Sequence, residues 1–185
     1  MIFKAVKESS FSLLMVVLML TAIPRAVSQS KSVSVNIPAL LLGCYNIEPS
    51  FMVSGKVSLH APVSWSPHTF KNNIRIKHVI VMAGARWWKW HGYSGLFTGG
   101  YLAYSKYNIS PGKYRYEGNA KGLTITAGYA KMLSRSWNIE MQAGLFAGAA
   151  KHDKFEKKMC GDYLDSTSQI VILPSGISVS LVYLF

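Results

Sequence analysis

Hydrophobic and polar residues alternate along most of the chain from about residue 33 onward. Over residues 137–150, for example, Ile139 and Met141 alternate with Asn138 and Glu140. Side chains at every second position of a β-strand lie on the same face of the sheet. The pattern therefore predicts strands that carry one apolar face and one polar face.

The alternation predicts eight strands, most of them longer than an ordinary soluble strand of about five or six residues. Their ranges are 33–42, 46–54, 56–66, 76–88, 94–105, 120–132, 137–150 and 170–185. Connections after the second, fourth and sixth strands are short, whereas those after the third, fifth and seventh are long. Tight turns on one side and longer loops on the other are typical of outer-membrane barrels.

We therefore expect residues 29–185 to form an all-β, eight-stranded antiparallel up-and-down transmembrane β-barrel. Closure is needed because an open sheet edge in lipid leaves backbone groups unpaired. A water-soluble secreted barrel or sandwich is the alternative, since it also produces alternation. The membrane form is favoured by small polar-face residues and by aromatic residues near the short turns, which are typical of a membrane interface. These aromatic residues are Trp87, Tyr129, Trp137 and Tyr183.

The first residues have the pattern of an export signal. Lys4 and Lys7 precede the apolar stretch 11–20, and an Ala-Val-Ser sequence ends at Ser28. This arrangement predicts a cleaved signal peptide over residues 1–28 and a location in the bacterial outer membrane. A helical membrane anchor is the alternative, but the apolar stretch is shorter than the roughly 20 residues that a helical span needs.

Composition agrees with one hydrophobic, basic domain. The 185 residues are 50% hydrophobic and only 15% charged, with a formal net charge of +12. The apolar content is too high for a disordered chain. Nucleic-acid binding is not expected despite the positive charge, because the chain is predicted to be exported and has no recognition motif.

Four short motifs resemble a known family. They are Ala85-Arg86-Trp87-Trp88, Arg115-Tyr116-Glu117-Gly118, the segment 133–140 and the terminal Tyr183-Leu184-Phe185. In order and spacing they are similar to the domain-of-unknown-function 3575 family of Bacteroidota, from about Val33 to Phe185. The resemblance implies an outer-membrane β-barrel whose relatives are often encoded near fimbrial or other surface-assembly genes. It implies no established activity, ligand or catalytic residue.

Two positions depart from the family pattern. Gly84 stands where a carboxylate often precedes the arginine, which weakens the expectation of a local Glu–Arg pair. Cys160 lacks the second nearby cysteine of the last loop. Cys44 is predicted near the outer end of the first strand, which neighbours the last strand in a closed barrel. Because exported proteins can form disulfides, a Cys44–Cys160 bridge is a hypothesis.

Arg86 and Glu140 fall on the polar faces of their strands, near the short turns. The interior of an eight-stranded barrel is narrow enough for side chains to fill it. Because either charge alone is costly to bury, we expect the two to pair as a static interior plug. The alternative is a gate in a narrow channel. Glu48 and His60 are expected to line the same polar interior.

Basic residues concentrate in two of the predicted outer loops. They are Lys71, Arg75 and Lys77 in one loop and Lys106, Lys113 and Arg115 in the other. Positive charge at a membrane surface attracts anionic head groups, so contact with outer-membrane lipid and lipopolysaccharide is expected. Recognition of an acidic glycan or of a surface or fimbrial protein is the sharper alternative.

Candidate enzyme chemistry is weak. A hydrolase needs a nucleophile, a base and an orienting group that meet at one place. His68, His78 and His152 fall near the predicted outer rim but lie in no motif, and no His or Cys spacing suits a metal. We therefore expect a structural or interaction role, with no enzyme activity and no cofactor. A lipid-modifying outer-membrane enzyme and a narrow channel are the alternatives.

Overall fold

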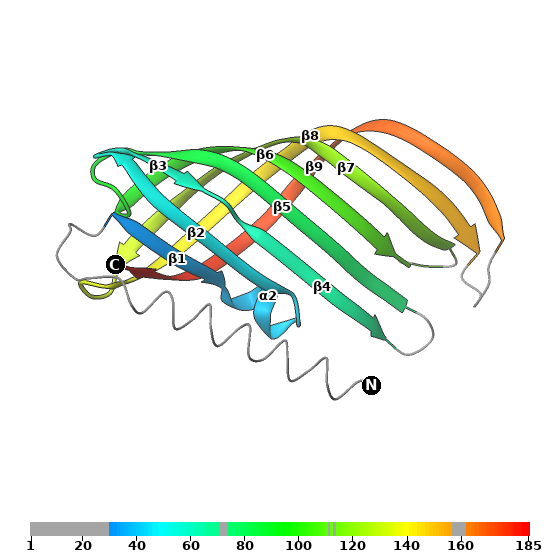
Figure 1. Cartoon of the computed structure of the whole chain (residues 1–185), viewed down its shortest axis with the longest axis horizontal. Helices are drawn as coiled ribbons and strands as arrows, with labels where there is room; N and C mark the ends of the chain where they lie inside the picture. Colours follow the sequence, from blue (N-terminus) through cyan, green and yellow to red (C-terminus); the bar gives the residue numbers. More distant parts are fainter. Residues whose placement is uncertain (1–29, 71–73, 111, 113, 157–161) are drawn as a thin grey trace.

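The computed structural model describes residues 30–70, 74–110, 112, 114–156 and 162–185, which form one antiparallel sheet and one short helix (Figure 1). In chain order the elements are β1 (Lys31–Asn36), α2 (Ile37–Leu41), β2 (Tyr45–Ser54), β3 (Val57–His60), β4 (Val63–Phe70), β5 (Ile74–Trp88), β6 (Gly95–Ile109), β7 (Tyr114–Met132), β8 (Trp137–Glu156) and β9 (Tyr163–Leu184). The predicted all-β antiparallel class is confirmed. The predicted signal peptide over residues 1–28 lies outside the described residues.

The strand pairings return to their starting point. Each strand from β5 to β9 pairs with the next, β9 pairs with β1, and β1 pairs with β2. Strand β2 pairs with both β3 and β4, and these two strands pair with β5. We call this closed set of pairings the ring, and the space that it encloses the interior.

Nine strands are described where the sequence predicts eight, because the predicted strand 56–66 is divided in two. Strands β3 and β4 follow one another along β5, and residues 61–62 separate them. Pro62 has no backbone N–H to continue a ladder. Its carbonyl still accepts a hydrogen bond from the Met82 N–H at 2.9 Å. The division is therefore a local break at a proline, and the two strands occupy one place in the ring.

The predicted strand 33–42 is wrong in its second half, where the chain forms the helix α2. Pro38 lies in the first turn of this helix, and the Asn36 side chain accepts a hydrogen bond from the Ala39 N–H at 3.3 Å. Asn46 of β2 also ends the β1 ladder, because its side chain accepts from the Asn36 N–H at 2.6 Å. Among the described residues, no helix has the length and apolar character needed to cross a membrane.

The three last strands are longer than predicted, and they extend beyond the other strands in Figure 1. Ladder pairing continues through residues 114–119, 151–156 and 163–169, which the sequence analysis assigned to loops. In the segments 151–156 and 163–169, both faces carry polar residues, so these two segments show no alternation of hydrophobic and polar residues. The pairing of β1 with β9 ends at Asn36 and Ser180, and no described strand pairs with the other edge of β9 over residues 163–179.

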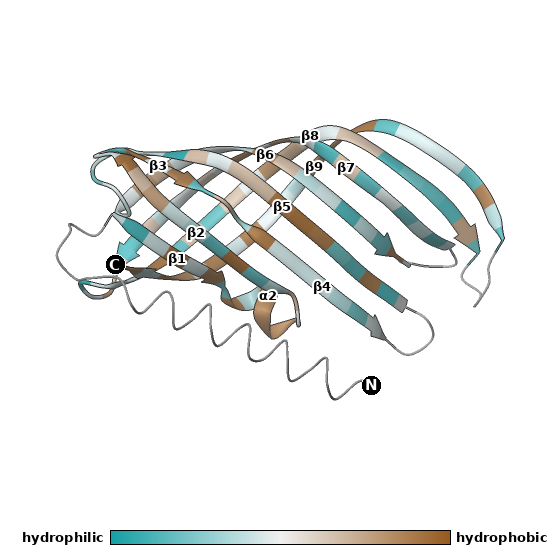
Figure 2. Cartoon of the chain, in the orientation of Figure 1, coloured by the Kyte–Doolittle hydropathy of each residue, from teal (hydrophilic) through white to brown (hydrophobic). Residues whose placement is uncertain are grey.

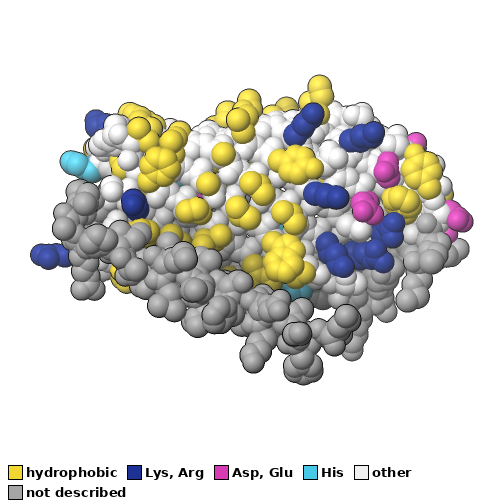
Figure 3. Space-filling model, viewed as in Figure 1, with side chains coloured by type: hydrophobic (Ala, Val, Ile, Leu, Met, Phe, Trp, Pro, Cys, Tyr) yellow, Lys and Arg dark blue, Asp and Glu magenta, His cyan; other side chains and the backbone are white. Residues whose placement is uncertain are grey.

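The two faces of the ring differ in polarity. Neighbouring residues show this directly, since Trp88 is 0% exposed in the interior and Trp87 is 51% exposed on the outer face. Hydrophobic and hydrophilic residues follow one another along the strands (Figure 2), and hydrophobic side chains spread over the face of the molecule in view in Figure 3. The aromatic residues predicted near the short turns are all exposed there, namely Trp87, Tyr129, Trp137 and Tyr183.

Candidate functional site

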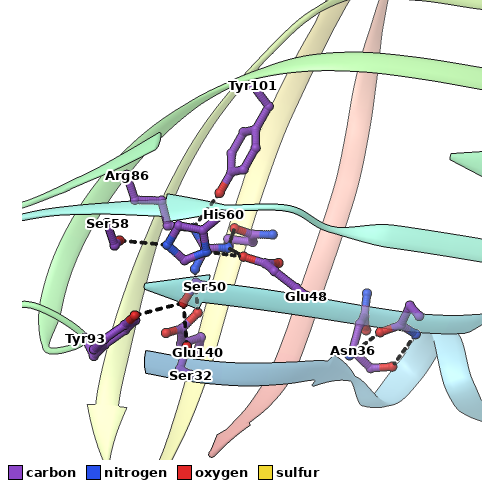
Figure 4. A network of polar contacts seen from close by, with 12 residues as sticks. Ser32, Asn36, Glu48, Ser50, Ser58, His60, Arg86, Tyr93, Tyr101 and Glu140 are labelled. Carbon is purple, nitrogen blue, oxygen red and sulfur yellow. Dashed lines mark hydrogen bonds and ion pairs between the residues drawn. The ribbon is translucent and has the colours of Figure 1, made fainter. Parts of the chain in front are cut away.

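A network of charged and polar side chains crosses the interior of the ring (Figure 4). Its centre is Arg86 of β5, which is 2% exposed. Arg86 Nη1 donates to Glu140 Oε2 of β8 at 2.8 Å, and Nη2 lies 2.6 Å from Glu48 Oε1 of β2. Nη2 also donates to Gln142 Oε1 at 3.1 Å, and Nε donates to the Tyr101 hydroxyl at 2.5 Å. The Arg86 guanidinium therefore connects its own strand β5 to side chains from three other strands, β2, β6 and β8.

Two glycines make room for the Arg86 side chain and its Tyr101 partner. Gly84 pairs with Tyr101, and a Cβ at Gly84 would overlap the Gly100 carbonyl oxygen and lie 2.7 Å from Tyr101 Cδ1. Gly99 pairs with Arg86, and a Cβ there would lie 3.2 Å from Arg86 Cγ. The glycine at position 84 thus leaves space for the tyrosine ring.

A hydrogen-bond relay holds Glu48 from its other side. His60 Nδ1 lies 2.6 Å from Glu48 Oε1, and His60 Nε2 lies 2.7 Å from Ser58 Oγ. Trp88 Nε1 donates to the same Ser58 oxygen at 2.8 Å. Because an ionised carboxylate can only accept, His60 Nδ1–H donates to Glu48. The Nε2 of the neutral ring then accepts from the Ser58 hydroxyl, whose oxygen accepts from Trp88. These side chains form one directed chain that orients the carboxylate.

Aromatic residues fill the interior at the end nearest the C-terminus of the chain. Trp88 packs against Phe97 and Tyr93, with ring centroids 4.8 Å and 5.6 Å apart. Phe97 also lies under the Arg86 guanidinium, 4.7 Å from its centroid. Asn138 donates to the Tyr93 carbonyl at 2.6 Å. This end of the interior is therefore packed by side chains.

A cavity of about 200 Å³, lined by both polar and apolar side chains, lies on the other side of the network. Glu48, Tyr101 and Gln142 contribute to its lining, together with hydroxyl and amide side chains from several strands. The lining hydroxyls of Thr126 and Ser178 are buried and have no hydrogen-bond partner among the described residues. The network thus separates a packed end of the interior from a hollow one.

The structure brings together all four residues that the sequence analysis assigned to the interior: Glu48, His60, Arg86 and Glu140. Sequence reasoning missed Tyr101 and Gln142 as partners of Arg86. Gln142 could have been found, because it lies two residues after Glu140 and so on the same face of β8. Tyr101 is 3% exposed and faces the interior, a position that the sequence analysis does not assign to it.

The remaining predicted residues lie apart from the network. The Sγ of Cys44 lies 3.1 Å from Ser64 Oγ and 3.3 Å from His78 Nε2. Cys160 lies outside the described residues, so the disulfide with Cys44 stays a prediction. His68 contacts the Gly43 carbonyl oxygen at 2.6 Å, and the His152 ring packs against Tyr116.

The predicted basic residues are spread over the long strands. Lys77 and Lys106 are exposed, on β5 and β6. Arg75 is on β5, and Arg115 of β7 lies 3.7 Å from Glu117 and over the Phe155 ring. Lys71 and Lys113 lie outside the described residues.

The network suits a role in holding the interior together. Its one arginine is shared by two carboxylates. The Ser58 hydroxyl contacts a base, His60, but Ser58 is fully buried. Within the described ranges, no group of three or more His, Cys, Asp or Glu side chains is placed to hold a metal ion. The contacts that join the network are charge pairs and hydrogen bonds.

Comparison with known proteins places the chain in a family. No curated protein matches the chain closely enough to count as a relative. A family model does match, and it covers residues 13–185, which is nearly the whole chain. The match includes every strand and all members of the interior network. The chain therefore belongs to the family described as "Protein of unknown function (DUF3575)".

Proposed function

We propose that the chain is an outer-membrane β-barrel protein with a structural or interaction role at the cell surface. The observation that carries this proposal is the distribution of side chains between the two faces of the ring. Arg86 and Glu140 are 2% and 3% exposed inside, whereas Ile125 and Ile177 are 70% and 79% exposed outside. A water-soluble sheet buries its apolar face, whereas a barrel in lipid turns it outward.

The closed pairing and the aromatic residues support the same proposal. Closure pairs backbone N–H and C=O groups, which hydrocarbon cannot solvate, except along one edge of β9 over residues 163–179. Exposed aromatic residues occur near both ends of the apolar outer surface, as expected at two membrane interfaces. Those nearer the short turns are Trp87, Tyr129, Trp137 and Tyr183, and those farther along the strands are Tyr45, Trp65 and Tyr104.

The side chains that fill one end and the middle of the interior favour a structural role over the alternative of a narrow channel. Trp88 and Phe97 occupy one end, and the Arg86 network crosses the middle. A conducting channel would require these side chains to move. Single-channel recordings that show conductance increased by Arg86→Ala would favour the channel. A change in the mass of membrane lipid on gene deletion would favour a lipid-modifying enzyme.

The extended ends of β8 and β9 support an interaction role. Tyr163 and Leu164 point to opposite faces of β9 and are 59% and 45% exposed. Leu173 is 53% exposed, and the adjacent edge of β9 has no described partner strand. Such a surface can contact a protein partner or lipopolysaccharide. A part in fimbrial or other surface-appendage assembly rests on the family resemblance alone.

The first experiment measures the gel mobility of the protein from purified outer membranes, with and without boiling. A folded barrel resists detergent at room temperature, so we expect the unboiled protein to migrate differently from the boiled one. Extraction of the same membranes with alkaline carbonate is expected to leave the protein in the pellet.

A single unshifted band, together with recovery in the soluble periplasmic fraction, would contradict the proposal. The exposed apolar face would then belong to a water-soluble protein that covers it in some other way.

For the interaction role, deletion of the gene is expected to alter a surface assembly, measured by counting appendages in electron micrographs. Complementation with the intact gene is the control.

A further inference from the structure

Three lysines stand next to one another on the outer face of β6, β7 and β8. Lys106 pairs with Asn119, which in turn pairs with Lys151, so the two lysines flank one residue of β7. Lys121 lies two positions from Asn119 on the same face, and all three lysines are exposed. Neighbouring strands are about 4.8 Å apart, so the three side chains start within roughly 10 Å of one another. We call Lys106, Lys121 and Lys151 the lysine cluster.

The lysine cluster lies at the outer boundary of the apolar surface. On β7, Tyr129 faces outward near a short turn, and Lys121 faces outward eight residues away. With a rise of about 3.3 Å per residue and a tilt of about 40°, the two are separated by roughly 20 Å along the barrel axis. Leu123 and Ile125, which lie between them on the same face, are 58% and 70% exposed. This separation is close to the height of about 25 Å expected of a lipid-facing band.

The three lysines of the cluster outnumber the two acidic residues that lie next to them on the same face. No carboxylate of the described residues forms an ion pair with any of the three lysines. The nearest acids in the ladder are Glu117 and Asp153, which pair with each other farther from the membrane band. Glu117 accepts a hydrogen bond from Asn108 at 3.2 Å and lies near Arg115.

The surroundings of the cluster suit a lipid head group. Tyr104 pairs with Lys121 and is 51% exposed, which places an aromatic ring beside the lysines. Leu102 and Leu145 are 69% and 60% exposed on the same outer face, where acyl chains can pack. Figure 3 shows Lys and Arg side chains beside the hydrophobic side chains on the face in view.

From this arrangement we propose that the lysine cluster binds the phosphate groups of a phosphorylated glycolipid in the outer leaflet. The inference rests on the proposed location in the outer membrane. A phosphate monoester carries up to two negative charges and several acceptor oxygens, which two or three ammonium groups can match. The acyl chains of the same lipid would lie along the exposed leucines of β6, β7 and β8.

The test uses the full-length protein refolded in detergent and titrated with purified lipid A, with bound lipid counted by native mass spectrometry. A variant that carries Lys106→Gln, Lys121→Gln and Lys151→Gln together is expected to bind roughly 100-fold more weakly, since each lysine contributes about a factor of five. The matched control changes the same number of exposed lysines near the short turns, at Lys56, Lys89 and Lys131. We expect this control to bind like the unmodified chain.

Two further titrations identify the group that is recognised. Enzymatically dephosphorylated lipid A is expected to bind the unmodified chain as weakly as lipid A binds the cluster variant. Inorganic phosphate alone is expected not to displace lipid A at millimolar concentration. Displacement by phosphate would assign the site to the free anion, and equal binding of both lipids would overturn the proposal.

The heat-dependent gel shift separates this inference from the proposed function. If all variants show the shift but do not distinguish the two lipids, the lipid-binding inference fails and the barrel proposal stands. If the unmodified chain shows no shift and is recovered from the soluble fraction, the proposed function fails first.

Discussion

Arg86 of β5 and Glu140 of β8 meet across the interior of the ring, with Nη1 and Oε2 2.8 Å apart, although β6 and β7 separate their strands. The same guanidinium lies 2.6 Å from Glu48 of β2. A single side chain therefore connects three parts of the ring that share no direct pairing. This arrangement leads to a prediction about which member of the network matters most for stability.

Replacing the arginine is expected to cost more stability than replacing either acid. In Arg86→Met, Glu48 and Glu140 both lose their cation inside the ring, which is expected to lower the free energy of unfolding by about 3–5 kcal/mol. In Glu140→Gln, the amide oxygen still accepts from Arg86, and Glu48 still balances the charge. Urea titrations followed by the gel shift compare the two. Equal stability of Arg86→Met and the unmodified chain would contradict the buried network.

Two glycines one strand apart provide a matched test of the space around Tyr101. In Gly84→Ala, the new methyl group meets the Gly100 carbonyl and the Tyr101 ring, so we expect a loss of about 1–3 kcal/mol from overpacking. In Gly100→Ala, the methyl group meets nothing within 4 Å, so stability is expected to change little. Both are measured by urea titration. A larger loss in Gly100→Ala would mean that the two faces have been assigned the wrong way round.

Trp87 and Trp88 are expected to report opposite environments when each is the only tryptophan left of the five. In vesicles of lipids with brominated acyl chains, Trp87 should be quenched strongly because it is 51% exposed on the outer face. Trp88, which is 0% exposed, should be quenched little. The gel shift of each variant verifies its folding. Equal quenching of the two folded variants would argue against a lipid-facing outer surface.

The rate of amide hydrogen exchange is expected to differ between strand β9 and its neighbour β8. Residues 163–173 of β9 have β8 on one side only, so alternate N–H groups lack a partner strand and should exchange rapidly. Residues 139–149 of β8 pair on both sides and should be protected. Hydrogen–deuterium exchange with peptide-level mass spectrometry measures both segments in one sample. Uniform protection of residues 163–173 would indicate that another segment covers this edge.

The inward positions of Arg86 and Glu140 could be predicted because strand alternation is a local property. A residue two places from another shares its face whatever the rest of the chain does. The same reasoning could not place Tyr101 against Arg86. That contact depends on the register between β5 and β6 and on the missing side chain at Gly84, and both are non-local features.

The strand ends were harder to predict where the two faces share the same polarity. Residues 151–156 contain Lys151, Asp153 and Lys154, so no alternation marks them as a strand, yet backbone pairing with β7 continues through them. The helix over 37–41 was missed for the opposite reason. Its residues are all apolar and resemble a buried strand, although Pro38 and the Asn36 cap favour a helical turn.

The ring closes through only five residue pairs between β1 and β9, from Ser32–Leu184 to Asn36–Ser180. Most of the other ladders join strands that are close in sequence and can form early as hairpins. Closure instead joins the two ends of the described chain, so it requires the largest loss of chain entropy for a short ladder. We therefore expect hairpin growth from β5 to β9 to be fast and the joining of β1 to β9 to be the slow, final event of folding.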